Sequence, residues 1–142
     1  MGYEIELSLD LRKHKSVTNI INNAQDLAEC YDCDRFYQFS ECNGEVRRLK
    51  KNLHIMVICF NKENFENMIN FLKEIIGKYK KKLYIESVYN INNHSLIYAS
   101  NYYMSIMEKE QKDDYKERRS NRSFSETDYF ILRDILKKNI NK

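Results

Sequence analysis

The feature that most limits the fold of this chain is an uncharged stretch of eight residues, Leu53–Phe60 (LHIMVICF). Lysine and asparagine flank it on both sides. A strand with one solvated face alternates apolar with polar residues, and this stretch does not alternate. The pattern therefore predicts a central strand that is covered on both faces. A buried helical segment is the alternative, although eight residues are few for a helix.

Three elements are expected before this strand. Tyr3–Leu11 alternates strictly between apolar and polar residues, which predicts a strand with one buried face. Ser16 is a candidate N-cap for a helix whose apolar residues recur at helical spacing as far as Tyr31. Residues 32–34 (Asp-Cys-Asp) interrupt that helix, and the aromatic-rich Arg35–Glu41 is expected to form a strand. An Asn-Gly turn signal follows it.

Three more elements follow the central strand. We expect a helix from about Glu63 to Tyr79, a strand over Leu83–Tyr89 and a further strand over Ser95–Ala99. The order βαββαβ predicts the α+β class and, within it, a ferredoxin-like sandwich with an extra C-terminal strand. In that arrangement the sheet is antiparallel and both long helices pack on one of its faces.

The tail is expected to be a helical appendage. Residues 102–112 are predicted to form a short helix, and the charged stretch 113–123 follows it. Residues 125–128 resemble a capping box ahead of an amphipathic helix that reaches about residue 140. We therefore predict a ferredoxin-like domain over 1–112. Residues 113–142 would form a linker and a helix that packs on the domain or on a partner.

Composition excludes little. The 142 residues are enough for one buried core. The net charge of +3, from 24 cationic and 21 anionic side chains, does not by itself imply a polyanionic partner. No run approaches the roughly 18 apolar residues of a membrane span, and the N-terminus lacks the pattern of a secretory signal. We expect an intracellular protein with reduced cysteines and no membrane partner.

Four side chains form the most obvious metal-binding pattern, namely Cys30, Cys33, Cys42 and His54. The expected strand 35–41 argues against it. An extended strand rises about 3.3 Å per residue, so the strand between Cys33 and Cys42 would hold them more than ~20 Å apart. The ligands of one zinc ion lie about 4 Å apart. A thioredoxin-like site is disfavoured too, because its Cys pair begins a helix and this pair ends one. We predict no metal site.

No catalytic motif is present. The chain lacks GxSxG, HExxH and a glycine-rich phosphate loop. Glu4, Glu6 and Asp10 share one face of a strand and could hold a divalent cation, although solvated carboxylates are commoner. An RNA-recognition face is disfavoured, because the central strand offers only Phe60 as an aromatic residue and the first strand is acidic. We predict a non-enzymatic protein without a cofactor; an enzyme built from scattered residues is a weaker alternative.

A basic end is the candidate site. In the ferredoxin-like order, the first strand–helix turn, the hairpin and the second helix–strand turn all lie at one end of the sheet. A phosphate-rich partner would be favoured there, with Glu45 as the only nearby anion. Solvated lysines in turns are the equally frequent alternative. The eleven cations are Arg12, Lys13, Lys15, Arg47, Arg48, Lys50, Lys51, Lys78, Lys80, Lys81 and Lys82.

The central strand also predicts an interface. Two helices can cover only one face of a sheet, yet this strand is apolar on both. We expect Met56, Ile58 and Phe60 to point away from the long helices, where exposure would forgo about 1.5–3 kcal/mol per side chain and mark an interaction patch. The C-terminal helix or a second copy of the chain would cover them, over the third strand and Arg35–Glu41.

Three segments resemble small proteins of large DNA viruses that infect amoebae. They are Gly2–His14 (GYEIELSLDLRKH), Leu96–Glu110 (LIYASNYYMSIMEKE) and Arg119–Leu132 (RSNRSFSETDYFIL). The resemblance spans most of the chain. That family has no established activity, so the resemblance implies no site residues. It implies a location in the host cytoplasm or the virion.

Two functions are predicted from the sequence. The first is a non-enzymatic binding module whose basic end contacts nucleic acid or another polyanion. The alternative is a structural or interaction protein that acts by self-association as a homodimer.

Overall fold

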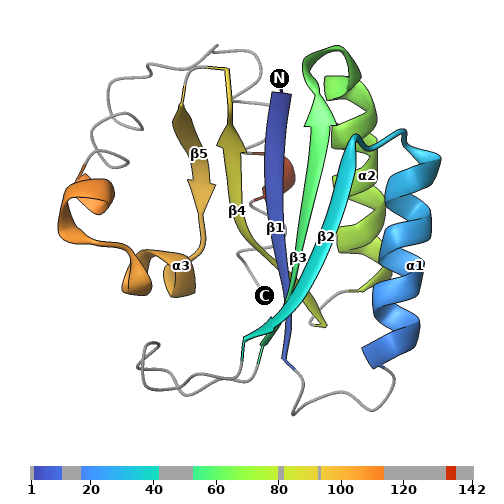
Figure 1. Cartoon of the computed structure of the whole chain (residues 1–142), viewed down its shortest axis with the longest axis horizontal. Coiled ribbons are helices and arrows are strands. Elements are labelled where there is room, and N and C mark those ends of the chain that lie inside the picture. Colours follow the sequence, from blue (N-terminus) through green and yellow to red (C-terminus); the bar gives the residue numbers. More distant parts are fainter. Residues whose placement is uncertain are drawn as a thin grey trace.

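The computed structural model of the chain describes residues 2–10, 17–41, 53–79, 82–92, 94–113 and 134–136 (Figure 1). Residues 109–113 and 134–136 form short helical turns. The named elements, in chain order, are β1 (Gly2–Asp10), α1 (Val17–Cys30), β2 (Arg35–Glu41), β3 (Leu53–Asn61), the 3₁₀ turn η1 (Lys62–Asn64), α2 (Phe65–Lys78), β4 (Leu83–Asn90), β5 (Ser95–Ala99) and α3 (Asn101–Ile106).

The strands form one sheet in the order β2-β3-β1-β4-β5, and every neighbouring pair is antiparallel. The predicted α+β class is confirmed. So is the position of the apolar stretch, because β3 lies inside the sheet between β2 and β1. The short helix expected over 102–112 is divided, since α3 ends at Ile106 and the helical turn 109–113 follows.

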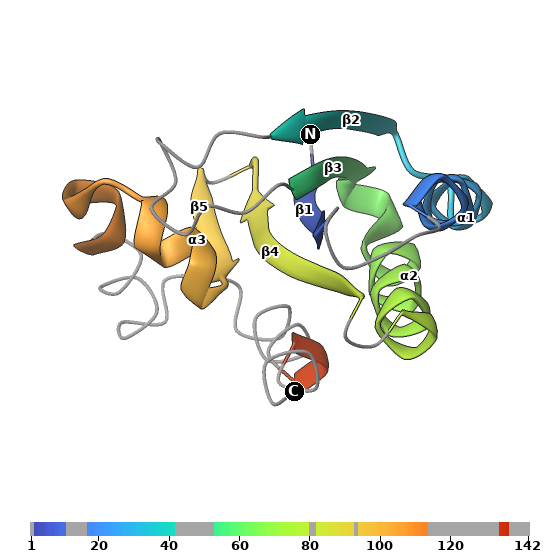
Figure 2. The ribbon, with the colours of Figure 1, turned by 90° about the horizontal axis from the view of Figure 1, so that it is seen from below.

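Both long helices pack on the same face of the sheet, as predicted (Figures 1 and 2). Two aromatic contacts join α2 to the sheet. The ring centroids of Phe60 and Phe71 lie 5.6 Å apart, and those of Tyr3 and Phe65 lie 5.1 Å apart. Helices whose apolar stripe faces a sheet bury that stripe together with one face of each strand. We call this side of the sheet the helix face and the opposite side the second face.

The predicted assignment of the two faces of β3 is wrong. Met56 and Ile58 are 0% exposed and Phe60 is 1% exposed, and all three belong to the core under the helices. They lie opposite Leu7, Ile5 and Tyr3 in the β1 ladder. Directly opposed residues of an antiparallel pair share a face. The apolar residues of β1 therefore carry those of β3 onto the helix face, and this set is no candidate interface.

The remaining apolar residues of β3 lie on the second face. Ile55 and Val57 are opposite Ser8 and Glu6 of β1, and Cys59 is opposite Glu4. Ile55 is buried, but it does not belong to the core cluster under the helices. The second face is thus a mixture of polar and apolar side chains.

The C-terminal turn packs on the helix face. Ile135 is 7% exposed and Leu136 is 1% exposed, and both join the same core cluster as α1 and α2. Figure 2 shows this red turn on the same side of the sheet as α2. The described part of the tail therefore does not cover the second face, contrary to one of the predicted covers. The rest of the tail helix expected over 125–140 lies outside the described residues.

Helix α1 ends in a Schellman motif. The Cys33 N–H donates to the Ala28 carbonyl at 3.0 Å, and the Asp32 N–H donates to the Glu29 carbonyl at 3.0 Å. These bonds satisfy carbonyls that the helix end would otherwise leave unpaired. The motif needs one left-handed residue, and Asp32 supplies it with φ 58°. The predicted interruption at 32–34 therefore has a definite geometry. The candidate N-cap Ser16 lies outside the described residues.

Candidate functional site

Four strand ends meet at one end of the sheet, which is the lower end in Figure 1. Asp10, the last residue of β1, is opposite Leu53, the first residue of β3. Glu41, the last residue of β2, is also opposite Leu53. Leu9 is opposite Leu83, where β4 begins. The connections that carry the predicted basic residues therefore start or finish at this end, which we call the lower end.

Two of the eleven predicted cations are described, and both lie at the lower end. Lys78 and Lys82 are exposed. The Lys78 ammonium lies 5.5 Å from the centre of the Tyr79 ring, a cation–π distance. The Lys82 N–H donates to the Tyr79 carbonyl at 3.0 Å. Nine cations lie outside the described residues: Arg12, Lys13, Lys15, Arg47, Arg48, Lys50, Lys51, Lys80 and Lys81.

The lower end also carries acidic positions that sequence reasoning missed. Asp10 and Glu41 are the terminal residues of β1 and β2 there. The prediction that Glu45 is the only nearby anion is therefore wrong, because acidic residues also stand at the strand ends. Two more carboxylates lower the net positive charge that the end can present to a polyanion.

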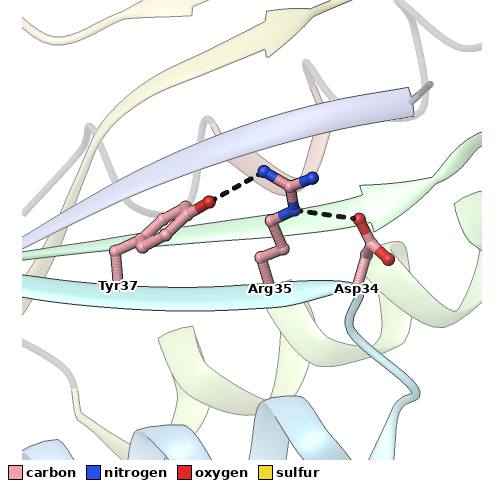
Figure 3. A network of polar contacts seen from close by, with 3 residues as sticks. All are labelled: Asp34, Arg35 and Tyr37. Carbon is pink, nitrogen blue, oxygen red and sulfur yellow. Dashed lines mark hydrogen bonds and ion pairs between the residues drawn. The ribbon is translucent and has the colours of Figure 1, made fainter.

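The second face carries an exposed polar network at its β2 edge (Figure 3). Arg35 Nη1 donates to the Tyr37 hydroxyl at 2.9 Å, and Arg35 Nε lies 3.7 Å from Asp34 Oδ2. The Arg35 side chain is 65% exposed. Such exposed pairs contribute little stability, about 0–1 kcal/mol. The network positions the guanidinium over the sheet but leaves it accessible to a partner.

Burial lowers the reactivity of two cysteines of the described residues, Cys33 and Cys59. Cys30, Cys33 and Cys59 are free. Burial, together with the nearby Glu4 carboxylate, raises the pKa of Cys59 to about 11. Burial also raises the pKa of Cys33, with Glu29 adding to the effect. A thiol with a raised pKa is protonated near neutral pH and is a weak nucleophile. Cys33 and Cys59 thus have the character of structural cysteines.

A buried carboxylate lies near the start of α3. Glu86 is 5% exposed, in β4 next to the register shift of the β1–β4 ladder. Its Oε1 accepts a hydrogen bond from Ser100 Oγ at 2.8 Å, and its carbonyl accepts one from the Ser100 N–H at 2.8 Å. Ser100 also caps α3 by accepting from the Tyr103 N–H at 3.0 Å. The pair fixes α3 against β4, and sequence reasoning did not single it out.

Among the described residues, no group of three or more His, Cys, Asp and Glu side chains could hold a metal ion. Cys42, from the candidate cysteine set, lies outside the described residues. His54, the candidate histidine ligand, lies in β3 with its Nε2 3.0 Å from Gln38 Oε1. None of the helices in the described ranges is long and apolar enough to cross a membrane.

Comparison with known proteins assigns no family. No family model, no curated protein and no solved structure matches this chain. The resemblance to proteins of amoeba-infecting DNA viruses therefore stays a prediction.

Proposed function

We propose that β1 to β4 with α1 and α2 form a ferredoxin-like unit to which β5 is added. The order β2-β3-β1-β4 and its antiparallel pairing support this assignment. So does the packing of both helices on one face (Figure 2). The fold alone does not specify a function, because the same architecture carries many unrelated sites.

We propose that the protein is a non-enzymatic module that binds nucleic acid or another polyanion through the lower end. The ladder register that brings four strand ends together is the observation that supports it. Three connections rich in Lys and Arg then start or finish at one end of the sheet. Neutralising phosphates there would release counterions and supply sequence-independent affinity.

The chemistry of the second face favours the lower end over the sheet surface as the binding site. Glu4 and Glu6 lie on that face and are partly exposed. Their charge would repel a phosphate backbone that approached the sheet flat on. The proposed contact therefore uses the turns, unlike an RNA-recognition domain, which stacks bases on its strands.

Salt dependence of binding tests this proposal. We expect the full chain to bind a labelled duplex at low salt, measured by fluorescence anisotropy, with a logarithmic slope of about −0.9 per neutralised phosphate. The variant with Arg47, Arg48, Lys81 and Lys82 all changed to Glu should lose binding. A matched control changes Lys62, Lys73, Lys109 and Lys112 to Glu and alters the net charge by the same amount.

The control decides whether the site is local. Its four lysines come from η1, α2 and the helical turn 109–113, outside the three basic connections. If the control loses binding as fully as the first variant, net charge and not the lower end is responsible. Absence of binding at low salt, or binding that does not change with salt, would reject the proposal.

A structural or interaction protein that acts as a homodimer is the second candidate function. The position of β2 at the edge of the sheet that the described residues form favours it. This strand carries the exposed side chains of Tyr37 and Arg35.

A further inference from the structure

The two edges of the sheet are protected to different degrees. β5 has five residues, its ladder with β4 contains a register shift, and α3 follows it almost directly. β2 has seven residues and pairs with β3 without any shift. Natural edge strands avoid pairing with other chains by being short, bulged, or rich in lysine and proline. β2 is neither short nor interrupted by a register shift, and it contains no lysine or proline; its two charged residues lie at its ends.

The exposed side of β2 also has an unusual composition for an edge. Its interior is Phe-Tyr-Gln-Phe-Ser, and charge occurs only at its two ends, Arg35 and Glu41. Tyr37 is 47% exposed, which makes it the exposed large hydrophobic residue of the described part of the chain. Gln38 is exposed beside it. An edge strand that carries an exposed aromatic residue is a template for adding another strand.

We infer that β2 pairs with β2 of a second copy of this chain, in an antiparallel ladder centred on Gln38. The sequence of the strand is complementary to itself in this register. Arg35 lies opposite position 41 of the second copy, a glutamate, and Tyr37 lies opposite position 39, a phenylalanine. Position 36 lies opposite position 40, and Gln38 lies opposite its own counterpart. The inference rests on the second candidate function and names the surface for it.

The charge pattern selects this register and this occupant. Opposite charges and aromatic pairs stabilise directly opposed positions, and like charges destabilise them. A shift of two residues would place Arg35 opposite Phe39, or Tyr37 opposite Glu41, and would leave the charges unmatched. The Arg35 side chain is 65% exposed and hydrogen-bonded to Tyr37 over the sheet. Pairing with position 41 of the second copy would turn this side chain toward the β2 edge. A strand with Arg at one end and Glu at the other fits its own antiparallel copy.

The symmetry has a consequence for the lower end. Two antiparallel strands are related by a twofold axis perpendicular to the sheet, so the helix faces of both copies lie on the same side. The five-stranded sheets then join into one continuous sheet. The two lower ends point in opposite directions along the strands. Pairing through β2 thus leaves both lower ends accessible.

Complementary charge reversals test the pairing. Sedimentation velocity of the full chain should show a dimer for the wild type. Arg35→Glu places Glu opposite Glu, and Glu41→Arg places Arg opposite Arg, so each variant alone should sediment as a monomer. Mixing the two variants should restore the dimer, because each Glu then faces an Arg. Circular dichroism verifies the fold, and Tyr37→Lys, a charge in the centre of the edge, should also give a monomer.

The outcomes separate the surface from the function. Dimers in both single variants and in Tyr37→Lys would overturn the β2 pairing and leave self-association through another surface. Folded single variants whose mixture stays monomeric would overturn the pairing as well. A wild type that is monomeric at high micromolar concentration would overturn both the pairing and the homodimer function. Restoration of the dimer by mixing supports the pairing.

Discussion

The rings of Phe60 in β3 and Phe71 in α2 lie 5.6 Å apart at an angle of 45°. Both side chains are fully buried. A tilted aromatic pair at this distance adds to the free energy gained from burial alone. The contact packs the central strand against α2 and shows which face of β3 forms the core. Val57 and Ile58, adjacent in sequence, therefore lie in different environments.

A lysine at each of these positions should separate the two faces. Ile58→Lys places an unpaired ammonium in the core and should lower the free energy of unfolding by about 3–5 kcal/mol. Val57→Lys should cost far less, because position 57 is partly exposed and lies opposite Glu6. Urea denaturation of both variants measures the difference. Equal losses would show that both faces of β3 are equally closed to water.

Much of the fold follows from periodicity in the sequence. The 3.6-residue repeat locates α1 and α2 to within two residues, and strict alternation locates β1. The faces of β3 could not be assigned in this way, because Ile55 and Val57 are as apolar as Met56 and Ile58. Only the register with β1 distinguishes the two sets. Register depends on long-range pairing, which no local pattern contains.

Less of the candidate site than of the fold could be predicted from the sequence. The lower end could be predicted because strand direction follows from the order of elements, and the ladders bring the expected strand ends together. The burial of Glu86 could not be predicted from the sequence, because it depends on the shift in the β1–β4 ladder and on Ser100, fourteen residues away. A bulge changes which residue faces inward without any signal in composition.

Two glycines should respond to alanine in opposite ways. A Cβ at Gly2 would clash with the Phe60 carbonyl oxygen and would lie 2.8 Å from backbone atoms of Asn61. Gly2→Ala must therefore displace β1 from β3, and we expect a loss of about 1–3 kcal/mol. At Gly77 in α2 a Cβ meets nothing within 4 Å. Gly77→Ala should raise the free energy of unfolding by about 0.5–1 kcal/mol. Thermal denaturation measures both, and a neutral Gly2→Ala would contradict the close approach.

Stability should decrease on mild acidification because of His54. Burial lowers the pKa of this imidazole below its usual 6.5, so the unfolded chain binds a proton before the folded chain does. The free energy of unfolding should then fall as the pH drops through about 6.5, and level off below the lowered folded pKa. Replacing His54 with Gln should remove this slope, measured as Tm against pH.

The control for His54 is a second histidine at the surface. His94 is exposed between β4 and β5 with φ 54°, and His94→Asn preserves a residue that tolerates this conformation. It should leave the slope between pH 5 and 7 in place. A slope that survives His54→Gln would assign the acid sensitivity to other groups.

Replacing Asp32 with Gly should stabilise the chain. Asp32 holds the left-handed position of the Schellman motif at the end of α1, with φ 58°. Glycine adopts this conformation without the steric conflict of a Cβ and is the residue most often found there. Removing a carboxylate from a helix C-terminus is favourable as well, because the macrodipole is negative at that end. We expect a gain of about 0.5–1 kcal/mol in the free energy of unfolding, measured by urea denaturation.

Asp32→Ala separates the two causes, because it removes the charge but keeps the Cβ. A gain with Gly and none with Ala assigns the effect to the backbone conformation, and an equal gain with both assigns it to the charge. A loss with Gly would mean that the Asp32 side chain itself supports the motif.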